Sequence, residues 1–115
     1  MKYDIEIYYD NDFECLLINV PDEIFLVADL VLSDIQEDGS GIWLDAVDKV
    51  LSKQSTYEEI SGNACVMKVK EDVTKVVFNF AEEGEQDHCL VETEELKKIF
   101  MLWDEAIENK YGESN

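Results

Sequence analysis

Arginine is absent from this chain of 115 residues, and its other cations are few. Nine lysines and one histidine stand against 28 aspartates and glutamates, which gives a formal net charge of −19. Binding to nucleic acids or to anionic membranes depends on contacts between lysine or arginine and phosphate groups. With so few cations available for such contacts, we expect no binding to nucleic acid and none to a membrane.

Several motifs of catalytic and cofactor sites are missing as well. His88 is the only histidine, so the usual Cys and His zinc sites cannot be completed from nearby residues. Cys89 would point to the opposite face of a strand from His88, although a pair of His88 with a distant cysteine stays open. The five glycines are scattered and form neither a phosphate loop nor a nucleophile motif. We therefore predict a protein that is not an enzyme, with no catalytic residues and no cofactor.

The cysteines and the apolar stretches indicate where such a chain resides. Cys15, Cys65 and Cys89 are odd in number, show no paired spacing and lie in apolar segments. Such cysteines fit a reducing compartment better than a disulfide framework. The first residues show no signal-peptide pattern, and acidic residues interrupt the apolar stretches before they reach the ~18 residues of a membrane span. The expected location is cytoplasmic.

The composition predicts a folded chain with an excess of negative charge. Apolar residues make up 46% of the sequence and include five Phe, five Tyr and two Trp, which a disordered acidic tail would lack. The length suits one domain spanning residues 1–115. A small domain needs a net charge of only about 2–8 for solubility. The excess favours a basic partner or a cation, and simple solvation of an acidic surface is the alternative.

The first half of the sequence predicts two strands followed by two helices. Residues 2–9 alternate between two faces, as in a half-buried strand, and 13–20 reads as the second strand of a hairpin. Apolar residues spaced three and four apart then predict a helix over 22–36, with acidic residues in its first turn. After a break at glycine, Ser40 is expected to cap a second helix over about 42–53.

The second half predicts three strands and a long helix. After a polar loop at 54–62, strand-like runs occupy 64–70 and 74–81, and a short apolar run at 88–92 follows an acidic loop. Thr93 is expected to cap the last helix. The apolar stripe of this helix is formed by Leu96, Ile99, Phe100, Trp103 and Ile107.

These elements predict an α+β fold of order ββααβββα. Its sheet would be mainly antiparallel, with the helices packed on one side. Within this fold, acidic residues gather at the turn between the first two helices and in the loop before 88–92. We predict that they bind a basic protein partner, since complementary charge steers association. The candidate partner-binding residues are Asp34, Glu37, Asp38, Asp45, Asp48, Glu82, Glu83, Glu85 and Asp87.

The turn between the first two helices also allows a different reading. Residues 34–45 resemble an EF-hand calcium loop, with Asp34, Asp38 and Asp45 at the first, fifth and twelfth positions and Gly39 at the sharp turn. The loop departs from that pattern because Asp45 replaces the bidentate Glu and Gln36 replaces an Asp or Asn. The alternative function is therefore a calcium-responsive or adaptor domain, with Asp34, Asp38 and Asp45 as metal ligands.

Residues 61–103 combine a short polar turn, a strand pair, an acidic loop and a transition from strand to helix. The motifs are Ser61-Gly62-Asn63, Glu71-Asp72-Val73-Thr74, and Cys89-Leu90-Val91-Glu92-Thr93-Glu94-Glu95-Leu96 leading to Ile99 and Trp103. This pattern resembles small bacterial immunity proteins, which neutralise polymorphic or contact-dependent toxins, many of them nucleases. The resemblance implies a cytoplasmic, non-enzymatic inhibitor that binds its toxin stoichiometrically. Nuclease toxins tend to be basic, so an acidic protein suits that role.

Overall fold

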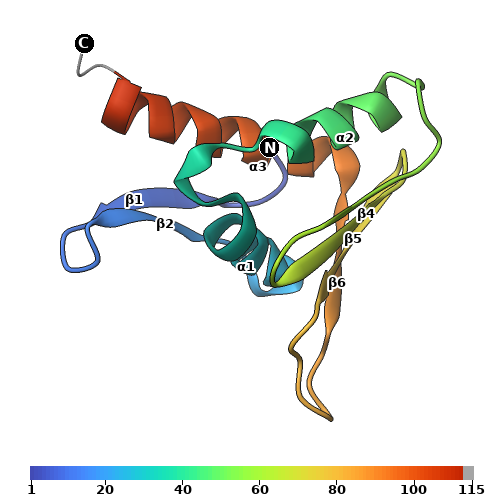
Figure 1. The fold of residues 1–115 in the computed structure, drawn as a ribbon, viewed down its shortest axis with the longest axis horizontal. Helices are drawn as coiled ribbons and strands as arrows, with labels where there is room; N and C mark the ends of the chain where they lie inside the picture. Colours follow the sequence, from blue (N-terminus) through green and yellow to red (C-terminus); the bar gives the residue numbers. More distant parts are fainter. Residues whose placement is uncertain (113–115) are drawn as a thin grey trace.

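The N-terminal part of the computed structural model, which describes residues 1–112, is a two-stranded antiparallel hairpin (Figure 1). Strand β1 (Glu6–Asp10) pairs with β2 (Cys15–Asn19), with Tyr8 directly opposite Leu17. The Asp10 carboxylate closes the turn by accepting hydrogen bonds from two backbone N–H groups of the turn itself. The alternating pattern of 2–9 and 13–20 thus predicted the hairpin correctly, although the strands in the structure are shorter than predicted.

The second sheet contains the other four strands of the described residues. They are β3 (Glu58–Ser61), β4 (Cys65–Val69), β5 (Val73–Phe78) and β6 (His88–Glu92). Each strand pairs antiparallel with the next one along the chain, in the order β3-β4-β5-β6. One face of this sheet is buried, as the alternation in β4 shows: Cys65, Met67 and Val69 are buried, whereas the residues between them are partly exposed.

The segment expected as one regular helix over 22–36 is helical but broken. It runs through η1 (Asp22–Ile24), α1 (Leu26–Asp29), η2 (Leu30–Ile35) and η3 (Gln36–Asp38), which change from 3-10 to α to π and back to 3-10 geometry. The apolar residues of this segment lie on nearly all sides of it, and most of them are buried. The segment therefore packs against its surroundings over most of its circumference, and tertiary packing outweighs the preference for a regular helix.

Two longer helices complete the fold. Helix α2 (Gly41–Leu51) follows the broken segment, and α3 (Thr93–Ile107) continues into the π-helical turn η4 (Glu108–Gly112). Ser40 occupies the N-cap position of α2, as expected, whereas Thr93 is already the first residue of α3, and neither hydroxyl makes a capping hydrogen bond. The Ser40 hydroxyl bonds to Asp104 instead of to the start of α2, and the Thr93 hydroxyl donates to the carbonyl of Lys70. Both hydroxyls connect distant segments, so the expected capping bonds were wrong, although α2 begins directly after Ser40 as predicted.

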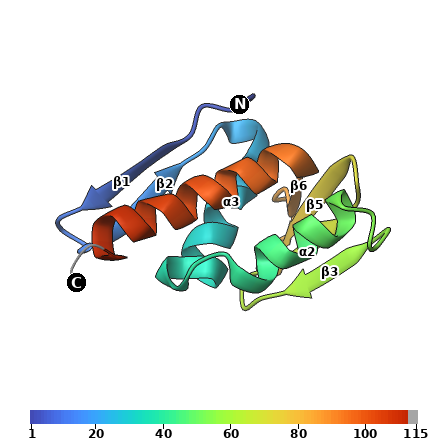
Figure 2. The same cartoon turned by 90° about the horizontal axis from the view of Figure 1, so that it is seen from above.

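Helix α3 is the centre of the molecule. Figure 2 shows it running between the β1–β2 hairpin on one side and α2 on the other. Its predicted apolar stripe is confirmed, because Leu96, Ile99, Phe100 and Trp103 are fully buried and Ile107 is partly buried. Burying a side chain of this size contributes about 1.5–3 kcal/mol.

The α+β prediction and the antiparallel pairing are confirmed, but the strands form two separate sheets instead of the single sheet expected (Figure 1). One strand was missed, because the expected polar loop at 54–62 contains β3. Its residues Glu58 and Ile60 point toward the partly buried side, and the other two are exposed. Among residues 1–112, no helix combines the length and the apolar character that a membrane crossing requires.

Candidate functional site

The predicted acidic residues fall into two groups that lie far apart. Asp34, Glu37, Asp38, Asp45 and Asp48 belong to η2, η3 and α2. The acidic residues of segment 82–87 lie in the loop between β5 and β6, which hangs at the opposite end of the molecule in Figure 1. The structure therefore does not combine the nine residues into one surface.

Asp34 has a structural role. Its two carboxylate oxygens accept hydrogen bonds from the backbone N–H groups of Ala64 (2.9 Å) and Cys65 (2.8 Å). These bonds attach the start of β4 to η2. They also account for Gly62, because a Cβ atom at that position would collide with the Asp34 carboxyl group. The Asp34 carboxylate is consequently occupied within the chain.

Glu37 and Asp48 are engaged in a similar way. One oxygen of Glu37 accepts hydrogen bonds from the Leu16 backbone N–H (2.9 Å) and the Tyr111 hydroxyl (2.8 Å). The Glu37 carboxylate raises the pKa of Tyr111 to about 12. Asp48 on α2 forms an ion pair of 2.8 Å with Lys97 on α3. Both acids join elements of the fold, and Asp38 and Asp45 are left as the exposed members of this group.

The structure does not assemble the ligands of the calcium-loop alternative. Asp34 is bonded to the backbone of β4, whereas Asp38 and Asp45 point to solvent from η3 and α2. Within residues 1–112, no three His, Cys, Asp or Glu side chains come together in a group that could hold a metal ion.

The loop between β5 and β6 presents the second acidic group to solvent. We call residues 82–87, with the carboxylates of Glu82, Glu83, Glu85 and Asp87, the acidic loop; all six residues are exposed. Beside it lies Phe80, whose side chain is 68% exposed. Asp87 contacts the imidazole of His88 at 2.9 Å, and this hydrogen bond lowers the pKa of Asp87. The acidic loop thus combines four carboxylates with an exposed aromatic ring.

Two of the three thiols are shielded from solvent. Burial, helped by nearby carboxylates, raises the pKa of Cys65 to about 12, and burial also raises the pKa of Cys89. Both therefore stay protonated at neutral pH, when a nucleophile would need to be a thiolate. Cys89 and His88 point to opposite faces of β6, as their alternation on a strand predicted. Cys15 is partly exposed.

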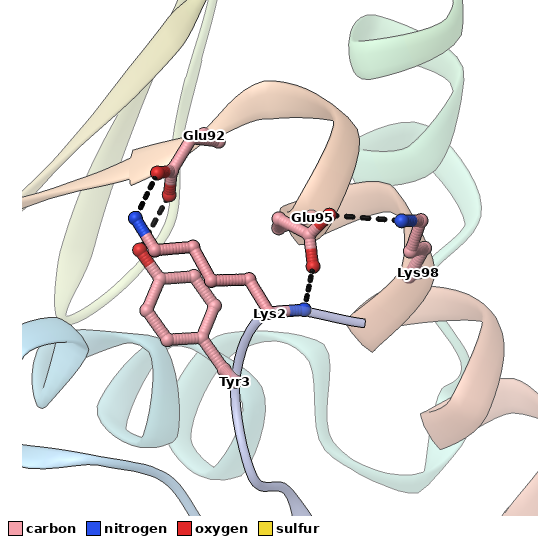
Figure 3. Close-up of polar contacts among 5 residues, drawn as sticks. All are labelled: Lys2, Tyr3, Glu92, Glu95 and Lys98. Atoms are coloured by element: carbon pink, nitrogen blue, oxygen red, sulfur yellow. Dashed lines mark hydrogen bonds and ion pairs between the residues drawn. The ribbon is translucent and has the colours of Figure 1, made fainter.

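Sequence reasoning missed a polar cluster that fixes the N-terminal segment to the junction of β6 and α3 (Figure 3). Lys2 reaches Glu92 through its ammonium group (2.5 Å) and Glu95 through its backbone N–H (2.7 Å). Tyr3 donates a short hydrogen bond to Glu92, and Lys98 binds the other oxygen of Glu95 (2.8 Å). These partners lie about 90 positions apart in the sequence, so no local pattern indicates the cluster.

Hydrogen bonds dominate the ionisation of this cluster. The bonds from Lys2 and Tyr3 lower the pKa of Glu92 to about 2. Burial and the same bond raise the pKa of Tyr3 to about 12. A deprotonated Glu92 beside a protonated Tyr3 and a charged Lys2 is therefore the stable state across the neutral range. The cluster therefore has a structural role: its bonds hold the N-terminal segment to the junction of β6 and α3.

A second missed feature is a surface pocket beside the acidic loop. It has a volume of about 360 Å³ and lies between α1, the end of β5 and the loop. Its lining residues are Phe25, Leu26, Asp29, Phe78, Ala81, Glu85 and Gln86. No pattern in the sequence indicates this pocket, because Asp29 lies within an apolar run and belongs to no acidic cluster. The pocket joins an apolar wall to two carboxylates.

One known protein aligns with most of the chain. A Bacillus cereus protein named "Immunity protein" is 32% identical over 100 residues, which cover 86% of this chain and 85% of that protein. No family model matches the chain, and no solved structure matches it. The similarity extends well beyond residues 61–103, where the sequence pattern resembled such proteins, and it confirms that resemblance. The chain thus belongs to a family of immunity proteins.

Proposed function

We propose that this chain is a non-enzymatic immunity protein that neutralises a bacterial toxin in the cytoplasm by binding it stoichiometrically. The observation that carries the proposal is the relationship to the Bacillus cereus immunity protein along most of both chains. An inhibitor of this kind needs a stable surface and no catalytic group. Steric occlusion of the toxin's active cleft, or of a nearby surface, is then sufficient for inhibition.

The charge supports a basic partner. A formal charge of −19 on 115 residues attracts a cationic protein over a distance and accelerates association at low salt. A nuclease toxin carries such positive charge in the groove that binds nucleic acid. We therefore propose a basic toxin domain, in particular a nuclease, as the partner.

The acidic loop is the proposed contact surface, because the carboxylates of the other acidic group are largely occupied within the chain. Asp34, Glu37 and Asp48 already bind groups within the chain, so docking through them would require breaking those bonds. The acidic loop instead offers carboxylates in solvent, next to the exposed ring of Phe80. Aromatic residues carry much of the binding energy in protein interfaces. Asp38 and Asp45 form a second exposed set, which we place outside the main contact.

The test begins with the gene next to that of this chain, which the proposal expects to encode a toxin domain, and uses that domain. Calorimetry with a catalytically inactive form of that domain should give a one-to-one complex whose affinity falls as salt rises. The double substitution Glu82→Gln and Glu83→Gln should weaken binding and flatten the salt dependence. The matched control, Asp38→Asn with Asp45→Asn, removes the same charge from the other end and should change the affinity less.

Two results would contradict the proposal. No complex at low or at high salt would exclude the toxin pairing. An affinity that is equally reduced by both double substitutions would show that only the total charge matters, and would remove the acidic loop as the contact surface.

A further inference from the structure

The pocket beside the acidic loop combines an apolar wall containing two phenylalanines with two carboxylates. Phe25, Leu26 and Phe78 give it an apolar wall, and Asp29 and Glu85 supply negative charge. Among residues 1–112, neither lysine nor histidine lines it. The charge in this pocket is thus uncompensated by the chain itself.

Asp29 is the unusual member of this set. It lies at the end of α1 and is partly buried, and its carboxylate interacts with its own backbone N–H but with no side chain among residues 1–112. Burial raises the pKa of Asp29. Its negative charge in turn contributes to the raised pKa values of the buried thiols Cys65 and Cys89. Removing a carboxylate from water without a partner destabilises a fold. A cation in the pocket would offset that loss.

Glu85 extends the negative charge to the rim. One of its oxygens accepts the Glu82 backbone N–H at 2.7 Å, which holds the side chain within the acidic loop. The second oxygen has no hydrogen bond to any of residues 1–112. A side chain that enters from solvent therefore meets the exposed Glu85, the aromatic wall and the partly buried Asp29.

We propose that this pocket receives an arginine side chain of the toxin, with its guanidinium group bound by Asp29 and Glu85 and its stem packed on Phe25 and Phe78. This inference rests on the proposed function and names the group that the toxin supplies. Arginine fits better than lysine because its planar fork binds carboxylates through several N–H groups and stacks on aromatic rings. Its apolar stem suits the wall of the pocket.

The other hollows that carry acids are less suited to the same occupant. The hollow at the end of α2 contains Asp45 and Asp48, but Lys49 and Lys97 line it as well. The hollow between β2 and η3 contains the exposed Asp38 and also Glu37, whose carboxylate already accepts two hydrogen bonds. A cation entering either hollow would meet contacts that the chain makes itself. A third hollow contains Asp4 and Glu6, but no aromatic ring lines it and Glu6 already accepts a hydrogen bond from the Asn19 side chain.

The first test requires no toxin. Nα-acetyl-arginine methylamide is titrated into the isotopically labelled full chain, and NMR follows the side chains of Asp29, Glu85 and Phe78. We expect saturable shifts at these groups in about the millimolar range, as is usual for one small contact. The uncharged citrulline analogue should give none, and neither should arginine with the Asp29→Asn variant. Shifts that are absent, or equal for arginine and citrulline, would overturn the proposal.

The second test measures toxin affinity. Asp29→Asn should lower it about 10- to 100-fold, as expected for loss of a charged hydrogen bond at an interface. The same variant should unfold at the same temperature as the wild type or higher, which separates a binding role from a structural one. The matched control Asp45→Asn should bind normally. Unchanged affinity of Asp29→Asn for the toxin would refute the arginine contact while leaving the proposed function intact.

If the wild type does not bind the toxin, the proposed function fails, and so does the assignment of this arginine to a toxin. The arginine titration still decides, on its own, whether the pocket recognises a guanidinium group.

Discussion

Ser40 and Asp104 lie 64 residues apart and are joined by two hydrogen bonds, from the Ser40 backbone N–H (2.8 Å) and from its hydroxyl (2.5 Å) to the two carboxylate oxygens. Ser40 is buried. The Asp104 carboxylate on α3 thereby accepts the hydrogen bonds of the N–H and hydroxyl groups at the start of α2. This carboxylate thus fixes the start of α2 to α3.

Replacing Asp104 by alanine should therefore destabilise the fold. The buried N–H of Ser40 would lose its partner, which costs about 1–3 kcal/mol. The measurement is the free energy of unfolding in urea. Glu105→Ala, on the exposed neighbouring residue of the same helix, should change it by less than about 0.5 kcal/mol. Equal effects of Asp104→Ala and Glu105→Ala would show that the contact adds nothing to stability.

Trp103 should be among the most costly residues to truncate. Its side chain is fully buried and its indole N–H donates to the carbonyl of Gln36 at 2.8 Å. Trp103→Ala should lower the free energy of unfolding by about 3–5 kcal/mol. Trp103→Phe keeps much of the packing and should lose less. Met101→Ala, at an exposed position two residues away, is the control, and a loss as large as that of Trp103→Ala would contradict the assignment.

Glu92 should make stability depend on pH in the acid range. Its pKa in the folded state is lowered from 4.5 to about 2, so its bonds to Lys2 and Tyr3 stabilise the fold above pH 4.5. This contribution is lost as the pH falls from 4.5 toward 2, because the carboxylate is then protonated. Urea unfolding over this range should show the loss for the wild type.

The Glu92→Gln variant isolates that contribution from the titration of the other acids. The difference in stability between the wild type and this variant should shrink as the pH falls through the same range. Glu94→Gln, which lies two residues further along the chain and is exposed, should give no such change. A difference that stays constant from pH 4.5 to 2 would show that the ionised Glu92 does not stabilise the fold through its bonds to Lys2 and Tyr3.

The three cysteines should differ in their reactivity. Cys15 is partly exposed, whereas Cys65 and Cys89 are buried with raised pKa values. A thiol reagent such as DTNB should modify one group of the folded protein quickly and the other two only with unfolding. The variant Cys15→Ser should abolish the fast phase. Fast modification of all three thiols in the native protein would contradict the structure.

The elements that could be predicted from the sequence are those whose residues alternate or repeat clearly. The stripe from Leu96 to Trp103 has a helical period, and β4 alternates between buried and exposed residues, so both were found. Strand β3 was missed because its four residues Glu58–Ser61 contain a single apolar side chain. It pairs only because β4 offers it a free edge, which no pattern within the segment indicates.

The side-chain roles depended on residues far away in the chain. Asp34 looked like a surface acid, but its partners Ala64 and Cys65 lie about 30 positions further on and occupy its carboxylate. The acidic loop was recognised because exposure follows from a dense run of charges between strands. The pocket around Asp29 could not be found, because α1, β5 and the acidic loop meet there only in the folded chain.

The acidic loop lies at the end of a strand pair, away from the packed helices α2 and α3 (Figure 1). Substitutions, insertions or deletions in it leave the hydrophobic core and the helix contacts untouched, since loops of this kind tolerate change. If the acidic loop is the contact surface, as proposed above, changes in this segment alone would suffice to alter the partner. The residues that hold the fold together would then not need to change.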